Sequence, residues 1–316
     1  MTIYSGFLNI NKGIGWTSND VVRKIRQIFK QRKAGHGGTL DPIATGVLPI
    51  SLGSASRLIS FLLDSEKSYV ITVTMGTSTD TYDSTGTVLH SGEWGLIEER
   101  DIFGAISKFK GKIQQIPPMY SALRYQGRRL YEIARKGGVV KREPRDITIT
   151  SIKMINYNPP NFTLDVTCSR GFYARSLAND IGIILKVPTH MSALHRTMTG
   201  NFKIEQSYSI EDCEQALLMG QLDDLLLPID YIIQYLPKLS LTDNESRMVC
   251  HGQSIKSKFH NNASLSENKE IVRLYDMHNL FLGLARLNEN KTILRPFKIM
   301  HYGTDGINTL GRKINV

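Results

Sequence analysis

Two segments of this 316-residue chain, residues 147–154 and 162–168, alternate between apolar and polar side chains. The alternation predicts two β-strands, because successive side chains of a strand point to opposite faces of a sheet. The connection between them holds Pro159 and Pro160 flanked by asparagines, a composition typical of turns, so we expect the strands to pair as a hairpin. The rest of the chain therefore has to fold around a sheet.

A different spacing, with apolar residues three or four positions apart, predicts helices beside this sheet. Val21, Val22, Ile25, Ile28 and Phe29 are spaced in this way, and the polar residues just before them can cap a helix. Further elements are expected as helices at about 99–109, 173–185 and 212–226, with a strand at 69–75.

Beyond about residue 237 the composition changes to short strand-like segments, at 271–275, 280–286 and 293–298. We expect a small β-rich domain over residues 237–316 and a larger domain over residues 1–232. Residues 114–145, rich in Pro, Gly, Tyr and Arg, look like a long excursion from the larger domain, and long loops of this kind usually bind something.

The charge of the chain points to a polyanionic partner. Its formal net charge is +10, and basic side chains cluster at 23–33 and again at 124–145. Such clusters favour nucleic acid, although a generally basic surface is the simpler explanation of the charge alone. No apolar run reaches the roughly 18 residues of a membrane span, and the first residues do not resemble a signal peptide, so we expect a cytoplasmic protein.

Metal chemistry and disulfide bonding are not expected. The three cysteines, Cys168, Cys213 and Cys250, lie too far apart in sequence for a disulfide framework or a Cys-x-x-Cys site, so we expect them to be reduced and buried. His190 and His195 have no acid nearby at the spacing of metal ligands. We therefore expect no metal.

Residues 35–46 hold one carboxylate, Asp41, in a turn with four glycines and a histidine. Glycine lets the backbone adopt positive φ or approach another group closely, while Pro42 fixes the chain just after the acid. Taken alone, Asp41 followed by Pro42 is more often a turn or helix cap than a catalyst. The remaining motifs decide between these interpretations.

Five ordered motifs closely resemble the TruB family of tRNA pseudouridine-55 synthases. They are Gly-Phe-Leu-Asn-Ile-Asn-Lys at 6–12 with Thr-Ser-Asn-Asp-Val-Val at 17–22, the turn at 35–46, Lys-Ser-Tyr at 67–69, Gln-Ile-Pro-Pro-Met-Tyr-Ser-Ala-Leu-Arg-Tyr-Gln-Gly-Arg-Arg-Leu-Tyr-Glu-Ile-Ala-Arg at 115–135, and Cys-Ser-Arg-Gly-Phe-Tyr-Ala-Arg at 168–175. The resemblance spans residues 6–203. More weakly, residues from 237 onwards resemble the PUA-type RNA-binding domain that many members carry.

The resemblance implies an α+β fold with a mixed, mainly antiparallel central sheet, flanking helices and a small PUA-like C-terminal domain. It also implies that one uridine in the T-loop of tRNA is isomerised to pseudouridine, without a cofactor, after the base is flipped out of the RNA. Asp41 would be the essential carboxylate, acting either as a nucleophile or as a base that gives a glycal. Arg175 would pair with it and keep it ionised.

The other implied site residues surround the target nucleotide. Tyr69 would stack on the base, Tyr173 and Leu194 would line the pocket, and His36 would occupy the space that the flipped nucleotide leaves. Residues 114–145 would form the thumb that closes over the T-arm of tRNA, with Arg128 and Arg129 contacting RNA. From the residues alone, plain packing in the core is the alternative role for Tyr69 and for Leu194. We expect a monomer.

Five positions depart from the family pattern. The family usually has Thr or Ser where Gly37 stands, Asp for Asn11, Pro for Gly13, His for Asn19, and Arg for His195. None of these changes removes the expected acid, tyrosine or arginine. An alternative function is that of an RNA-binding folding factor without catalysis, which the basic clusters support equally well. Only the set of Asp41, Tyr69 and Arg175 distinguishes the enzyme from such a factor.

Overall fold

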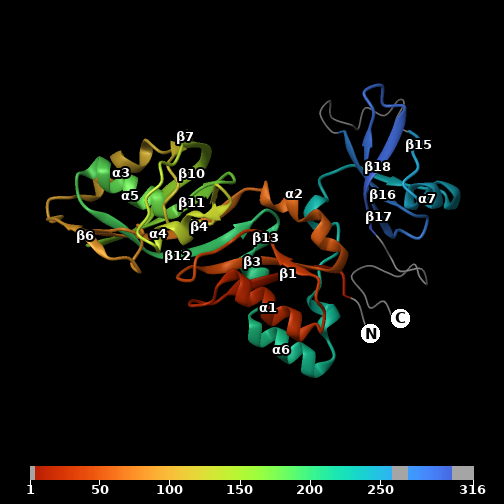
Figure 1. Cartoon of the computed structure of the whole chain (residues 1–316), viewed down its shortest axis with the longest axis horizontal. Coiled ribbons are helices and arrows are strands. Elements are labelled where there is room, and N and C mark those ends of the chain that lie inside the picture. Colours follow the sequence, from red (N-terminus) through yellow and green to blue (C-terminus); the bar gives the residue numbers. More distant parts are fainter. Residues whose placement is uncertain (1–3, 258–269, 301–316) are drawn as a thin grey trace.

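The computed structural model describes residues 4–257 and 270–300, which form two main sheets with helices beside them (Figure 1). The strands of the larger sheet are β1 (Gly6–Lys12), β2 (Ala34–His36), β3 (Thr45–Leu52), β4 (Lys67–Met75), β7 (Gly111–Gln115), β10 (Arg145–Asn158), β11 (Asn161–Cys168), β12 (Thr189–Thr199) and β13 (Phe202–Lys203). Two small ribbons pair β5 (Thr77–Thr79) with β6 (Val88–Ser91) and β8 (Arg124–Tyr125) with β9 (Arg128–Arg129).

The larger sheet has the order β1-β3-β12-β4-β11-β10-β7, with β2 paired to β3 and β13 to β12. Its strand pairs are antiparallel except for β3 with β12, which are parallel at His195 and Arg196. The mixed, mainly antiparallel sheet is therefore confirmed. The hairpin expected from the alternating segments is β10 and β11, where Asn158 pairs with Asn161.

Helices pack beside this sheet in two pairs. They are α1 (Ser18–Ile28) with α6 (Ile210–Met219), and α3 (Glu99–Ser107) with α5 (Ala174–Leu185) (Figure 1). The predicted cap of α1 is confirmed, since Thr17 and Asp20 form a capping box. The apolar stripe of α1, from Val21 to Phe29, is buried in the main core.

The prediction of a helix at 212–226 is wrong about the C-terminal end of the helix. Helix α6 ends at Met219, because Gly220 adopts a left-handed conformation that closes the helix, and a short 3₁₀ turn, Leu222–Leu225, follows. Other short helical segments are Gly53–Leu58, α2 (Ile59–Leu63), α4 (Leu130–Ala134), Ile204–Gln206 and Tyr231–Ile233.

The C-terminal part is β-rich, as predicted. Its sheet has the order β14 (Lys238–Ser240), β16 (Ile271–Tyr275), β17 (Phe281–Leu287), β18 (Ile293–Ile299) and β15 (Ile255–Lys256), with α7 (Asp243–Cys250) beside it. Residues 204–237, which include α6 and three short 3₁₀ turns, connect the larger sheet to this one. Residues 1–3 and 301–316 of the two expected domains, and 258–269 within the second, lie outside the described residues.

An apolar cluster joins the two sheets. Phe7, Leu58 and Leu62 from the first part of the chain pack in one buried cluster with Phe281 and Leu284 of β17. Hydrogen bonds reinforce the contact, because Lys298 Nζ donates to the Arg57 carbonyl and the Arg57 guanidinium donates to the Ile299 carbonyl. The C-terminal sheet is consequently packed onto the segment around α2.

The three cysteines differ in their exposure to solvent. Cys168 and Cys213 are free and buried, but Cys250 is exposed, so the expectation that all three are buried is wrong; Cys250 is the last residue of the surface helix α7.

In residues 4–257 and 270–300, no helix is long and apolar enough to cross a membrane. The same residues contain no group of three or more His, Cys, Asp or Glu side chains placed to hold a metal ion.

Candidate active site

Asp41 lies in the loop between β2 and β3, and Arg175 lies in the first turn of α5. The Arg175 guanidinium contacts both oxygens of the Asp41 carboxylate, with Nε 2.9 Å from Oδ2 and Nη2 3.0 Å from Oδ1. Residues 134 positions apart in the chain therefore form one two-point ion pair. The Arg175 side chain is 8% exposed and that of Asp41 is 31% exposed, so only the acid is open to solvent.

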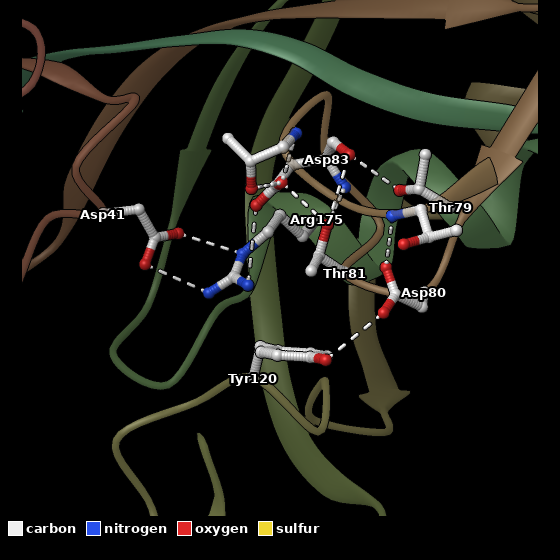
Figure 2. A network of polar contacts seen from close by, with 9 residues as sticks. Asp41, Thr79, Asp80, Thr81, Asp83, Tyr120 and Arg175 are labelled. Atoms are coloured by element: carbon white, nitrogen blue, oxygen red, sulfur yellow. Dashed lines mark hydrogen bonds and ion pairs between the residues drawn. The ribbon is translucent and has the colours of Figure 1, made fainter. Parts of the chain in front are cut away.

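A second carboxylate lies on the other side of Arg175. Asp83 Oδ2 is 3.7 Å from Arg175 Nη1, and Figure 2 shows Arg175 between Asp41 and Asp83. The Asp83 side chain is 5% exposed and is held by its neighbours. Its Oδ1 accepts hydrogen bonds from the Thr81 hydroxyl and from both the backbone N–H and the hydroxyl of Thr85.

The protonation of Asp41 is set by opposing effects. Burial raises the pKa of the Asp41 carboxyl, Arg175 lowers it, Asp83 raises it again and Lys12 lowers it, with a net upward shift. Both oxygens nonetheless accept from the permanently charged guanidinium, a contact that suits the ionised carboxylate. Asp41 is therefore a carboxylate whose pKa lies above the ordinary aspartate value.

Two buried basic residues hold the backbone around Asp41. Lys12 is fully buried, and its Nζ donates to the carbonyls of Gly13, Trp16 and Pro42 at 3.0, 2.7 and 3.4 Å. Because of this burial, the pKa of Lys12 falls to about 8. Arg196 is 1% exposed and donates to the carbonyls of Val47 and Gly38 at 2.7 and 3.1 Å. The loop carrying Asp41 is thus fixed at both ends.

Two glycines of this turn allow close packing within the protein. A β-carbon on Gly46, whose φ is +99°, would lie 2.2 Å from the Arg196 carbonyl oxygen. A β-carbon on Gly37 would lie 2.2 Å from Leu62 Cδ2. The close approach expected from the glycines therefore involves the strand β12 and the helix α2.

A cavity of about 690 Å³ opens beside Asp41, a size typical of ligand sites. Its wall comes from five parts of the chain: the start of α1, the Asp41 loop, the polar loop after β5, the excursion at 114–145, and Arg175 of α5. The lining residues include Ser18, His36, Asp41, Thr81, Asp83, Tyr120, Arg124, Arg129, Tyr131, Arg135 and Arg175. Four basic side chains therefore face the same space as the acid.

Of the residues predicted from the sequence, His36, Asp41, Arg129 and Arg175 meet at this cavity. His36 Nδ1 is buried without a hydrogen-bond partner among the described residues. Burial lowers the pKa of His36, and Arg196 lowers it further. A neutral, flat ring is therefore placed at the cavity wall.

The other predicted residues lie close by but do not line the cavity. Tyr69 is 8% exposed on β4, and its ring lies 5.8 Å from that of Phe172. Burial raises the pKa of the Tyr69 phenol, Arg196 lowers it, and the charge of Asp41 adds a smaller rise. Tyr173 occupies the N-cap position of α5, two residues before Arg175, and Leu194 is buried opposite Ile71. Arg128 is exposed in β9.

The sequence motifs did not single out Asp80, Asp83 or Tyr120 as site residues. Asp80 and Asp83 stand in the polar loop between β5 and β6. Tyr120 was only part of a motif, yet it lines the cavity. The available signal was a pair of acids between glycines, at 80–86, which turns and binding sites share.

Comparison with known proteins shows the family of the chain. A model described as the TruB family pseudouridylate synthase N-terminal domain matches residues 26–174. Models of the tRNA pseudouridylate synthase B C-terminal domain and of the pseudouridine synthase II TruB C-terminal region match 175–234 and 237–296. A tRNA pseudouridine synthase B of Haemophilus influenzae (strain PittEE) is 40% identical over 298 residues, covering 93% of this chain and 95% of the relative. The chain belongs to the TruB family.

Another relative agrees with TruB membership, and a solved structure shares the fold. The tRNA pseudouridine synthase B of Caldanaerobacter subterraneus subsp. tengcongensis is 40% identical over 295 residues, covering 93% of this chain and 98% of the relative. Among solved structures, a chain in a Cbf5-Nop10-Gar1 complex aligns with a TM-score of 0.71 and 24% identity, covering 94% of this chain and 85% of the other. At that identity the alignment shows the shared fold.

Proposed function

We propose that this chain isomerises one uridine of tRNA to pseudouridine, at position 55 in the T-loop, with Asp41 as the essential carboxylate. The observation that carries the proposal is the two-point pair of Asp41 with the buried Arg175 at the wall of a basic cavity. A positively charged cavity suits a phosphate-bearing substrate. TruB membership supplies the reaction, and the names of the relatives supply the substrate class.

In this reaction the bond from N1 to C1′ breaks, the uracil turns, and C5 bonds to C1′ while the C5 proton leaves and N1 gains a proton. The product is an isomer of the substrate, so the proposal requires neither a cofactor nor a metal. Asp41 either bonds to the nucleotide covalently or removes a sugar proton. Both routes need the ionised form, which Arg175 stabilises by direct pairing.

The remaining site residues have binding roles in the proposal. Tyr69 stacks on the target base, since its raised pKa keeps the phenol neutral at pH 7. Tyr173 and Leu194 complete the pocket, and His36 occupies the space left in the T-loop. Arg128 and Arg129 contact the RNA backbone from the excursion at 114–145. The C-terminal sheet, as a PUA-like domain, adds RNA contacts.

The protein acts as a monomer in this proposal, because one chain supplies all the residues of the site. The reaction takes place in the cytoplasm, where tRNA is processed in bacteria such as those that encode the relatives. The T-arm stem-loop is then a sufficient substrate, since the target and its stem both lie within it.

The test is pseudouridine formation on a T-arm stem-loop labelled with tritium at C5 of the target uridine. Wild type releases tritium, whereas Asp41→Asn loses about 10²–10⁴-fold or more of the rate while keeping RNA affinity. Asp165→Asn, an exposed acid on β11, is the matched control and keeps the wild-type rate. Release by Asp41→Asn at the wild-type rate would contradict the mechanism. RNA binding by wild type without any release would instead support a folding factor.

A further inference from the structure

The excursion at 114–145, called the thumb from here on, is fixed at its base to helix α5. Gln115 exchanges two hydrogen bonds with the backbone of Tyr173, at 3.3 Å from Nε2 to the carbonyl and 3.0 Å from the amide to Oε1. The Ser176 hydroxyl donates to the Ile116 carbonyl at 2.7 Å. On the returning segment, the Arg142 guanidinium donates to the Pro117 carbonyl at 3.1 Å.

Beyond this base, the thumb forms a hairpin that reaches the cavity. The backbone N–H of Leu130 donates to the Leu123 carbonyl at 2.8 Å, and that of Tyr131 donates to the Ser121 carbonyl at 3.1 Å. The hairpin carries Arg124, Arg129 and Tyr131, which line the cavity beside Asp41. The position of this hairpin therefore decides where its cationic side chains stand relative to Asp41.

Tyr120 lies at the start of the hairpin and connects it to a different part of the protein. Its hydroxyl donates to Asp80 Oδ2 at 3.2 Å, as Figure 2 shows. The other oxygen of Asp80 accepts the backbone N–H of Thr87 at 2.8 Å, which closes the loop between β5 and β6. Gly86 makes room for this carboxylate, because a β-carbon there would lie 2.4 Å from Asp80 Oδ1.

The same loop holds Asp83, the second carboxylate on Arg175. The Thr79 hydroxyl donates to the Asp83 carbonyl at 2.7 Å, and the Asp83 side chain accepts from Thr81 and Thr85. Outside the loop, the Ser84 amide donates to the Met191 carbonyl and the Met191 amide to the Tyr82 carbonyl, both at 3.0 Å. The loop is thus stiff, and it touches the thumb through Asp80 and Arg175 through Asp83.

We propose that the Tyr120–Asp80 hydrogen bond is a latch that sets the position of the thumb over the Asp41 cavity, and that Tyr120 is therefore a positioning residue. The latch holds the thumb against the loop between β5 and β6, which also contacts Arg175. The RNA-contacting side chains of the thumb and the pair of Asp41 with Arg175 are therefore supported by the same rigid loop. It acts through the thumb and touches no reacting atom. The inference deepens the proposed function and, for its effect on the rate, rests on it.

The first test uses the protein without RNA. The thumb holds several trypsin sites, at Arg124, Arg128, Arg129 and Arg135. Tyr120→Phe removes only the hydroxyl, and we expect cleavage within the thumb to become about fivefold faster, the effect of losing one hydrogen bond. Tyr125→Phe removes a hydroxyl from the exposed tip of the same hairpin and leaves the cleavage rate unchanged. Equal cleavage of wild type and Tyr120→Phe would overturn the latch, whatever the activity of the enzyme.

The second test separates positioning from binding. With saturating T-arm RNA in single turnover, Tyr120→Phe lowers the rate about fivefold, whereas its Kd for RNA changes less than twofold. Asp80→Asn weakens the same contact, so it causes little additional loss in the Tyr120→Phe background. Independent, multiplying losses from the two substitutions would overturn the coupling. If the wild-type protein had no activity, the proposed function would be refuted. The latch would still be tested by the proteolysis experiment, which does not depend on activity.

Discussion

The side chain of Leu62 occupies the space that a β-carbon on residue 37 would need. Its Cδ2 lies 2.2 Å and its Cγ 3.1 Å from the position of that atom, and Leu62 is 2% exposed. Gly37 is the position in the Asp41 turn where the resemblance to the TruB family leads us to expect Thr or Ser. The structure explains the glycine, because α2 approaches the turn so closely that a larger residue at position 37 would require rearrangement.

The first prediction follows from this contact. Gly37→Ser forces Leu62 to move, and we expect the free energy of unfolding in urea to fall by about 1–3 kcal/mol. Leu62→Ala alone costs about 2–5 kcal/mol through its cavity. In the double variant the serine has room, so the combined loss is smaller than the sum by about 1 kcal/mol or more. Additive losses would show that Leu62 does not restrict residue 37.

The second prediction concerns the geometry of the ion pair. Arg175→Lys keeps the charge but loses the planar fork that contacts both oxygens of Asp41, and one charge-assisted hydrogen bond is lost. We expect the single-turnover rate to fall about 10–100-fold, with RNA affinity little changed. Arg170→Lys is the control, because its pair with Asp64 is exposed and contributes little. A wild-type rate for Arg175→Lys would show that charge alone suffices.

The third prediction is a pH dependence. Because the pKa of Asp41 is shifted upward from its ordinary 3.8, the carboxylate is protonated as the pH falls through that raised value. The rate therefore declines with a midpoint above pH 3.8, measured by brief pH jumps in single turnover. Asp83→Asn removes a charge that raises this pKa, so it moves the midpoint to lower pH. An unchanged midpoint in Asp83→Asn would argue against electrostatic contact between the two acids.

The fourth prediction concerns the basic thumb. Affinity for T-arm RNA falls as salt rises, because bound cations are released from the phosphates. Arg128→Ala removes an exposed cation of the thumb, and we expect the slope of log affinity against log salt to flatten by about 0.7–0.9. Lys153→Ala, exposed on β10, leaves the slope unchanged. Equal slopes for wild type and Arg128→Ala would place Arg128 outside the RNA interface.

Local pattern predicted most of the fold. The apolar stripe from Val21 to Phe29 forms helix α1, and the alternating segment at 162–168 forms strand β11, as predicted. Burying one face of a helix or strand requires apolar residues at the spacing of that element, so the spacing predicts the element. The end of α6 was placed too late, since the apolar residues at 222–226 continue the helical pattern beyond Gly220. There the left-handed glycine decided the boundary.

By itself, the sequence determined the helices and the hairpin, the polyanionic character of the partner, and, through its motifs, the family and the candidate pair of Asp41 and Arg175. Only the tertiary structure decided that Asp83 lies against Arg175 and that Tyr120 reaches Asp80. The reason is that these contacts join residues 40 or more positions apart through the packing of α5, the β5–β6 loop and the thumb. The periodicity of the sequence predicts local elements and does not predict contacts between residues so far apart in the chain.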